Sequence, residues 1–304
     1  MTLPALASGW SAAAYGRLRA AFGLWLAFHF AHLLPWCAEL FSSAGVIADG
    51  AASPHLRLFP NLFLISDAPG FVLAVHLAAT AAALLLALGK ADRAAAVFLW
   101  YVLACQFGRN PLILNPALPY VGLLLLAHAL QPRARAGGEW RRDPRLFALL
   151  WILMAAGYTF SGITKLASPS WLDGSALAQV LDNPLARDAW PRAALLALPD
   201  GLLRAATWAA LGLELAFAPL ALLRRARRWV WLAMVLMHLA LIVLVDFADL
   251  TAGMLFLHAF TCDPAWLRRG QAACDAGAPP AAESRGASSS SSPGKPFVQC
   301  SFSR

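Results

Sequence analysis

Long runs of apolar residues recur along this sequence, and they restrict what the chain can fold into more than any other feature does. Many runs hold about 20 residues, enough for a helix to cross roughly 30 Å of hydrocarbon. The chain is 60% hydrophobic and only 13% charged, whereas a soluble domain is nearer to a quarter charged. The runs are continuously apolar rather than alternating, which favours helices over the strands of a barrel. We therefore expect an all-α, polytopic integral membrane bundle.

We expect about eight transmembrane helices within a membrane domain of residues 1–269. The spans cover residues 19–40, 69–89, 93–108, 111–131, 146–165, 202–223, 229–249 and 251–267. The first run is too long for a typical signal peptide, and no small-residue cleavage site clearly follows it, so we expect it to remain as a span. Residues 270–304 are rich in Ala, Gly, Ser and Pro, and we expect them to form a disordered cytoplasmic tail.

Basic residues flank these runs unevenly, and this asymmetry predicts an orientation. One side would carry Arg17, Arg19, Lys90, Arg93, Arg133, Arg135, Arg141, Arg142, Arg145, Arg224, Arg225, Arg227, Arg228, Arg268 and Arg269. The other would carry Arg57, Arg109, Lys165, Arg187 and Arg192, with Arg204 at its margin. The positive-inside rule then places both termini in the cytoplasm, and we expect the inner membrane of a bacterium. The net charge of +8 gives little support to nucleic-acid binding, because it is divided among membrane-flanking loops.

A lysine ends the fifth run, in the stretch "YTFSGITKLASPSWLDG". Tyr158, Ser161 and Lys165 are spaced i, i+3 and i+7, so they share one face of a helix. Gly162 lets a neighbouring segment approach the backbone closely. The amine of Lys165 is either a base in a partly dehydrated pocket or an anchor that reaches the interface, where Trp171 would also lie.

Ionisable residues within the later runs are candidates for lining a cavity. Glu214 and His238 are expected at similar depth on neighbouring helices, where they form either a proton-transfer pair or a structural hydrogen bond. Asp249 follows His238 by eleven residues, which on one continuous helix returns it to the same face. There is no HExxH motif and no dense group of Cys and His, so we predict no metal site.

The short connection "GRNPLILNPALPY" is unusually polar. Arg109, Asn110 and Asn115 lie in it among several prolines. The segment either lines a cavity or is an ordinary tight turn whose arginine reaches the interface.

Five cysteines show neither CxxC nor zinc spacing. Cys37 and Cys105 are both expected near the outer ends of their spans. They are either small buried hydrophobic residues or a redox pair on the oxidising side of the membrane.

The stretch "YTFSGITKLASPSWLDGSAL" resembles the signature of the HTTM family, membrane proteins similar to vitamin K-dependent gamma-carboxylase. The matching positions are Tyr158, Ser161, Gly162, Lys165, Leu166, Trp171 and Gly174, and the resemblance runs over roughly residues 15–267. It implies that Lys165 is the base that deprotonates a vitamin K-like quinol. The segment "GRNPLILNPALPYVGLLLLAHAL" is similar to the subgroup around the sporulation-delaying toxin's membrane maturation protein.

Three functions follow as hypotheses. The first is an outward-facing membrane enzyme that uses Lys165 on a lipid-soluble quinol or modifies a small secreted peptide. The second is an accessory protein for peptide maturation that works beside a partner subunit, and the third is a non-catalytic transport or immunity protein. The sequence offers an Asn at 115 but no following His where the carboxylase has an Asn-His pair, so carboxylation of a docked protein is the least supported form of the first hypothesis.

Overall fold

The computed structural model describes residues 10–113, 115–132, 142–246 and 248–266. Within these residues the fold is entirely helical, and the only β-type pairing described is an isolated bridge between Ala186 and Val245. The expectation of an all-α protein is therefore confirmed. The expected tail at 270–304 and the basic stretch 133–141 lie outside the described residues.

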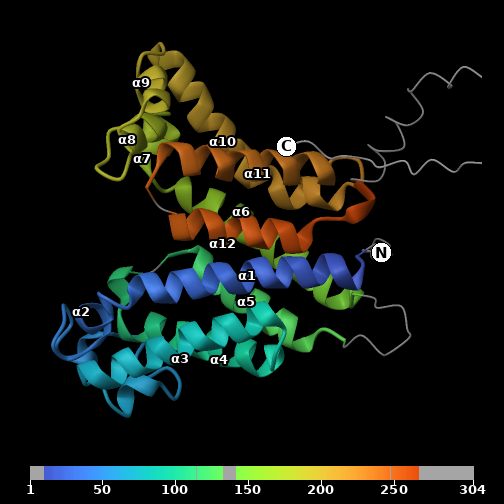
Figure 1. The fold of residues 1–304 in the computed structure, drawn as a ribbon. Helices are drawn as coiled ribbons and strands as arrows, with labels where there is room; N and C mark the ends of the chain where they lie inside the picture. Colours follow the sequence, from blue (N-terminus) through green and yellow to red (C-terminus); the bar gives the residue numbers. More distant parts are fainter. Residues whose placement is uncertain (1–9, 114, 133–141, 247, 267–304) are drawn as a thin grey trace, which may run out of the picture. The chain divides into compact units, whose positions relative to one another are not determined.

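Eight longer helices follow one another along the described chain (Figure 1). They are α1 (Ala12–Leu33), α3 (Pro69–Leu88), α4 (Asp92–Arg109), α5 (Ala117–Leu130), α6 (Pro144–Lys165), α10 (Asp200–Leu222), α11 (Arg227–Leu244) and α12 (Ala248–Thr261). Their ends carry recognisable signals. Pro69 occupies the first turn of α3, and Gly89 ends that helix with a φ of 72°, a conformation in which a side chain is strained. The Asp143 carboxylate accepts a hydrogen bond at the start of α6.

Shorter helical pieces form the connections between the longer helices. They are α2 (Cys37–Phe41), η1 (Gly50–Ala52), η2 (Leu62–Leu64), η3 (Pro111–Ile113), α7 (Pro169–Leu172), α8 (Ala176–Leu181) and α9 (Trp190–Leu196). The pieces α2, η1 and η2 lie between α1 and α3, whereas α7, α8 and α9 lie between α6 and α10. These are the two long segments, 41–68 and 166–201, that separate expected spans.

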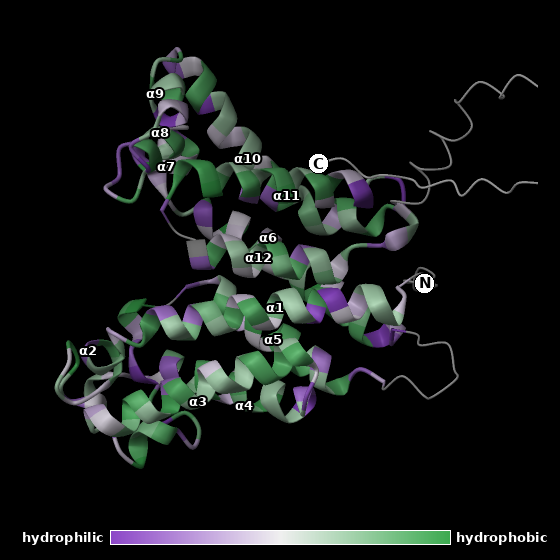
Figure 2. Ribbon diagram, in the orientation of Figure 1, coloured by the Kyte–Doolittle hydropathy of each residue, from purple (hydrophilic) through white to green (hydrophobic). Residues whose placement is uncertain are grey.

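Four helices, α3, α6, α10 and α11, are long and apolar enough to cross a membrane, judged by length and composition, and α5 is a shorter apolar helix. Figure 2 shows hydrophobic residues along most of the length of the helices, with hydrophilic residues gathered mainly at helix ends and in connections. Many large apolar side chains on these helices remain exposed, among them Leu77, Ile152, Phe160 and Leu236. Such exposure over several helices is consistent with a membrane protein.

Four expected spans have different limits in the structure, and the last of them, expected at 251–267, is the helix α12 from Ala248 to Thr261. The first run is interrupted after Leu33, and a separate short helix begins at Cys37, because Pro35 has no backbone N–H and cannot continue a helix. The run expected at 111–131 becomes η3 and then α5, which starts only at Ala117; Pro111 and Pro116 account for the delay. The run expected at 229–249 ends at Leu244. Asp249 therefore lies in α12, and the prediction that it shares a continuous helical face with His238 is wrong.

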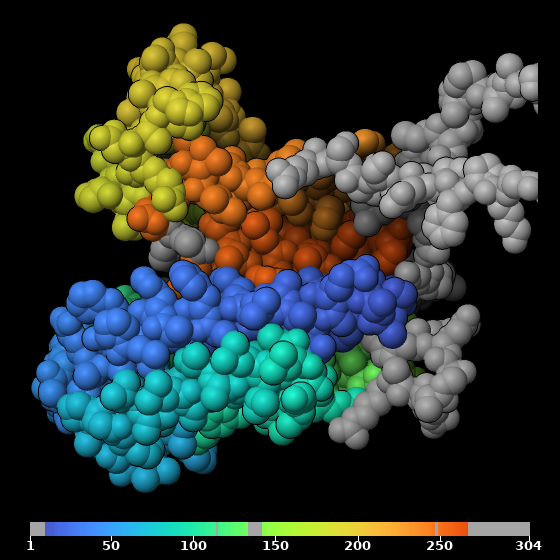
Figure 3. Space-filling model, viewed as in Figure 1, coloured from blue at the N-terminus to red at the C-terminus, as the bar shows by residue number. Residues whose placement is uncertain are grey.

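The helices pack in pairs that are often distant in sequence. Helix α1 lies along α3 (Figure 3), α4 packs against α3 and α5, and α6 packs against α10. Helix α12 contacts α1, α5, α6 and α11. The core between them is built from aromatic and aliphatic side chains such as Phe22, Leu26, Leu124, Phe217 and Phe260.

Candidate functional site

The last turn of α6 carries a short ion pair. The ammonium of Lys165 lies 2.5 Å from both carboxylate oxygens of Glu214 on α10. The Glu214 side chain is 7% exposed and that of Lys165 is 24% exposed. A buried carboxylate is costly without a partner, so the lysine compensates a charge that the apolar surroundings could not otherwise hold. Sequence spacing had paired Glu214 with His238, whereas the structure pairs it with Lys165.

An indole ring also contacts the Lys165 amine. Trp171 in α7 has its ring centroid 4.5 Å from Lys165 Nζ, within the range of a cation–π interaction. The chain turns back at this point because Pro169 starts α7 and Gly174, with a φ of 83°, follows it. The hydroxyl and backbone N–H of Ser175 lower the pKa of Asp173 in the same turn, which keeps that exposed carboxylate ionised.

Trp171 also borders a pocket of about 360 Å³ formed by the segment between α6 and α10. Its walls hold three uncharged polar side chains, those of Ser170, Gln179 and Asn183, among apolar residues of α8 and the end of α11. The same indole thus contacts the Lys165 amine and lines this pocket. An uncharged, half-apolar wall suits a neutral ligand with a planar or apolar body and a few hydrogen-bonding groups.

Two turns earlier on α6, a tyrosine joins two histidines. The hydroxyl of Tyr158 lies 2.7 Å from Nε2 of His238 on α11 and 2.7 Å from Nε2 of His258 on α12. All three side chains are buried. A hydroxyl has one proton, so Tyr158 donates to one ring and accepts from the other. Neutral rings would therefore be opposite tautomers, and a shift of both bridging protons would exchange them only if one ring also loses its Nδ1 proton and the other gains one.

The outer nitrogens of both rings are buried and have no hydrogen-bond partner among the described residues. If both rings are neutral, one of these Nδ1 atoms carries a proton and the other a lone pair. Tyr158 and Lys165 lie seven residues apart on α6, which is about 10 Å along the helix. The His–Tyr–His group and the Lys–Glu pair thus occupy one stretch of α6, facing α10, α11 and α12.

Close approach of α6 and α10 positions both groups. A Cβ at Gly162 would lie 2.9 Å from the backbone nitrogen of Leu215, so only glycine allows this spacing. The hydroxyl of Thr159 donates to the Glu214 carbonyl at 3.3 Å and accepts from Ala218 N–H at 3.1 Å. The expectation that Gly162 lets a neighbour approach the backbone is confirmed. Ser161, expected on the same face as Lys165, is partly exposed.

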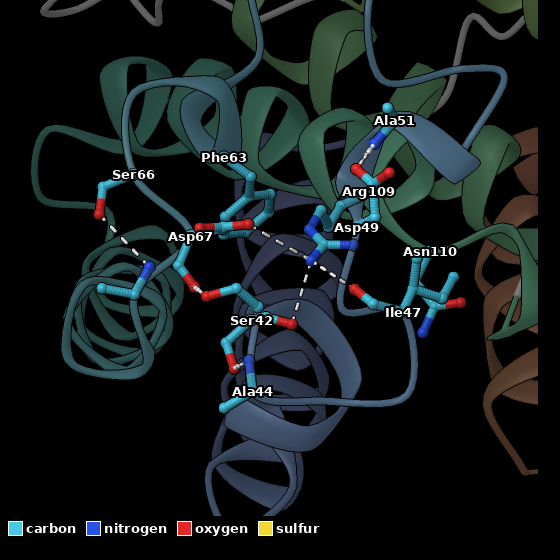
Figure 4. Close-up of polar contacts among 12 residues, drawn as sticks. Ser42, Ala44, Ile47, Asp49, Ala51, Phe63, Ser66, Asp67, Arg109 and Asn110 are labelled. Carbon is cyan, nitrogen blue, oxygen red and sulfur yellow. Dashed lines mark hydrogen bonds and ion pairs between the residues drawn. The ribbon is translucent and has the colours of Figure 1, made fainter.

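Arg109 and Asn110 lie at a different place, where α4 meets the segment between α1 and α3 (Figure 4). Arg109 is fully buried, and its Nη2 donates to the carbonyls of Ser42 and Ile47 at 3.0 and 2.7 Å. Asp67 Oδ2 lies 3.6 Å from the same nitrogen. Asn110 donates to the Leu40 carbonyl at 2.8 Å. These side chains hold the segment 41–68 on the end of α4.

The remaining candidates serve local structure. Asn115 accepts a hydrogen bond from Ala117 N–H at 2.8 Å, at the start of α5. Asp249 lies 3.1 Å from Nδ1 of His29 and so ties α12 to α1. In the described part of the chain Cys37 and Cys105 are buried, free thiols, and Cys105 Sγ accepts from Leu62 N–H at 3.4 Å.

Sequence reasoning missed the role of His258. No spacing in the sequence links this histidine to Tyr158, 100 residues earlier. No cluster of three or more His, Cys, Asp or Glu side chains suited to a metal occurs among the described residues.

Searches of family models, of curated proteins and of solved structures found no match to this chain.

Proposed function

We propose that this chain is a membrane enzyme of the HTTM type in which Lys165 and Glu214 exchange a proton with a lipid-soluble quinol. The observation that carries the proposal is the short contact between the amine and both carboxylate oxygens, in an apolar helical bundle. Such a pair has no net charge whether the proton lies on the nitrogen or on the oxygen, so the proton can move at low electrostatic cost. With the proton on Glu214, the amine of Lys165 is a free base.

Trp171 and its adjoining pocket support a planar ligand beside that base. The indole offers an aromatic face, and Ser170, Gln179 and Asn183 offer hydrogen-bonding groups. A quinol would supply an acidic hydroxyl there. Lys165 would take the proton, Glu214 would hold the amine in place, and Trp171 would limit access of water to it.

The topology is part of the same proposal. Eight spans, with both termini in the cytoplasm of a bacterium, would place Lys165 at the outer end of α6 and Arg227 at the inner start of α11. The four long apolar helices and the basic flanks of the chain support this arrangement. Reporter fusions after Asn183 and after Arg224 test it: only the first should be active as an extracytoplasmic reporter, and the reverse result would invert the topology.

The test of activity uses the full chain in liposomes containing a reduced naphthoquinone. Quinol and oxygen consumption are followed together, with and without carbon dioxide and a glutamyl peptide. We expect wild-type turnover to fall at least 100-fold in Lys165→Ala and to persist in Lys90→Ala, whose lysine is exposed on the turn between α3 and α4. Equal turnover in the wild type and Lys165→Ala would contradict the proposal.

A second candidate function is that of an accessory protein that holds a small secreted peptide. The pocket beside Trp171 favours it, because amide side chains among apolar residues also match an extended peptide. A photoreactive residue at Val180 should then cross-link to an added peptide, and a quinol should not compete. Competition by the quinol would instead favour quinol binding in this pocket, as the first function requires.

A further inference from the structure

A second pocket lies where the starts of α1 and α4 meet the ends of α3 and α5. Its volume is about 270 Å³. The lining includes Arg19 on α1, Gly89 at the end of α3, Asp92 and Arg93 at the start of α4, and His128 and Gln131 at the end of α5. Nothing in the proposed chemistry of Lys165 uses these residues.

Two guanidinium groups are built into this pocket. Arg19 Nη1 donates to the carbonyl of Leu86, and Arg93 Nη2 donates to the carbonyl of Gln131. Each guanidinium has five N–H groups, so each keeps further donors after this single bond. The bonds to backbone carbonyls fix both arginines at the pocket instead of leaving them free to extend into solvent.

The shape of the α3–α4 turn makes room for one of them. A Cβ on Gly89 would lie 2.6 Å from Arg19 Nη1 and 2.8 Å from Nη2. The guanidinium therefore occupies space that the side chain of any other residue at position 89 would need. Gly89 also has a φ of 72°, which independently favours glycine.

Among the described residues that line the pocket, Asp92 supplies the one carboxylate, and it is already engaged. Asp92 Oδ1 accepts from Arg93 N–H at 3.0 Å, and Oδ2 lies 3.3 Å from Nε2 of His128. Two arginines against one aspartate leave an excess of positive charge. His128 is also held by the Tyr15 hydroxyl at 3.0 Å.

We propose that this pocket binds a phosphate group, with Arg19 and Arg93 as its ligands. Guanidinium groups bind phosphate oxygens through paired N–H donors, and basic pockets between membrane helices on the cytoplasmic side take anionic lipid headgroups. The same chemistry is offered by a phosphodiester of an anionic lipid and by a free phosphate ester. In the proposed topology, Arg19 and Arg93 lie on the cytoplasmic side of the membrane. Anionic lipids and free phosphate esters are both present on that side.

The test uses the full chain in an uncharged detergent, with phosphatidylglycerol, phosphatidylcholine or glycerol 1-phosphate added separately. Native mass spectrometry counts the bound molecules, and thermal unfolding reports the stabilisation. We expect phosphatidylglycerol to bind and phosphatidylcholine not to. Stabilisation by glycerol 1-phosphate as well would assign a free phosphate ester to the pocket. The proposal would be overturned, without any variant, if the wild-type protein bound phosphatidylglycerol no more tightly than phosphatidylcholine and glycerol 1-phosphate had no effect.

Variants then locate the site. Arg19→Gln and Arg93→Gln should each weaken phosphatidylglycerol binding about fivefold, which corresponds to about 1 kcal/mol per arginine near a phosphate. Arg17→Gln is the matched control, because Arg17 is an exposed arginine two residues from Arg19 that does not line the pocket. An equal loss in Arg17→Gln would mean general surface charge and would also overturn the proposal.

Discussion

Lys165 and Glu214 are 49 residues apart in the chain, yet the lysine ammonium contacts both oxygens of the glutamate carboxylate at 2.5 Å. The contact joins the last turn of α6 to the middle of α10. Removing either partner leaves the other as a poorly solvated charge among apolar side chains.

The contributions of Lys165 and Glu214 to the free energy of unfolding should therefore depend on each other. We expect Lys165→Met and Glu214→Gln each to lower the free energy of unfolding by about 3 kcal/mol. The double variant Lys165→Met/Glu214→Gln should lose less than the sum of the two single losses, because no unpaired charge remains. Unfolding in a detergent series measures all three. Additive losses would show that the two side chains act independently.

Tyr158 should be the residue that holds α11 and α12 to α6 through its hydroxyl. Tyr158→Phe removes both contacts and leaves Nε2 of His238 and of His258 without that partner. We expect a loss of about 1–3 kcal/mol. Tyr120→Phe is the matched control, because the Tyr120 hydroxyl lies against Gly157 and makes no hydrogen bond among the described residues. Comparable thermal shifts in the two variants would argue against the His–Tyr–His link.

Gly162 should be intolerant of the smallest possible side chain. Gly162→Ala places a methyl group 2.9 Å from the backbone of Leu215, so α6 and α10 must separate, at a cost of about 1–3 kcal/mol. Gly212→Ala, on α10, has nothing within 4 Å of the new methyl group and should be neutral or stabilising by up to about 1 kcal/mol. Thermal unfolding separates the two cases, and an equal response would mean that packing at Gly162 is not limiting.

Arg109 should hold the segment between α1 and α3 in place. Arg109→Gln shortens the side chain and removes the bonds to the Ser42 and Ile47 carbonyls. We expect faster hydrogen exchange in residues 42–56 with little change in α6 and α10. Arg57→Gln, in the same segment but exposed, is the control. Unchanged exchange in Arg109→Gln would remove this role.

The apolar runs predicted many of the helices that the structure contains, because helix formation is largely a local property. A helix needs only a continuous stretch of suitable residues, so the limits of α3, α4, α6 and α10 agree closely with the expected spans. Local reasoning also explains the errors, since Pro35 was read through as part of the first run. It had likewise extended the seventh run past Leu244 to Asp249.

What the sequence could not determine is which helices meet, and at which height. The i, i+3 and i+7 spacing grouped Tyr158 with Lys165, but it could not show that one would bond to His238 and His258 and the other to Glu214. The segment of Arg109 and Asn110 had been read as lining a cavity or as a tight turn, whereas both side chains bond to the segment before α3. Such pairings join residues that are tens of residues apart, and they depend on the packing of whole helices at positions such as Gly162. Residue spacing shows which side chains share one face of a helix, because that is a local property. Which other helix the face contacts is decided only by the tertiary packing of the whole bundle.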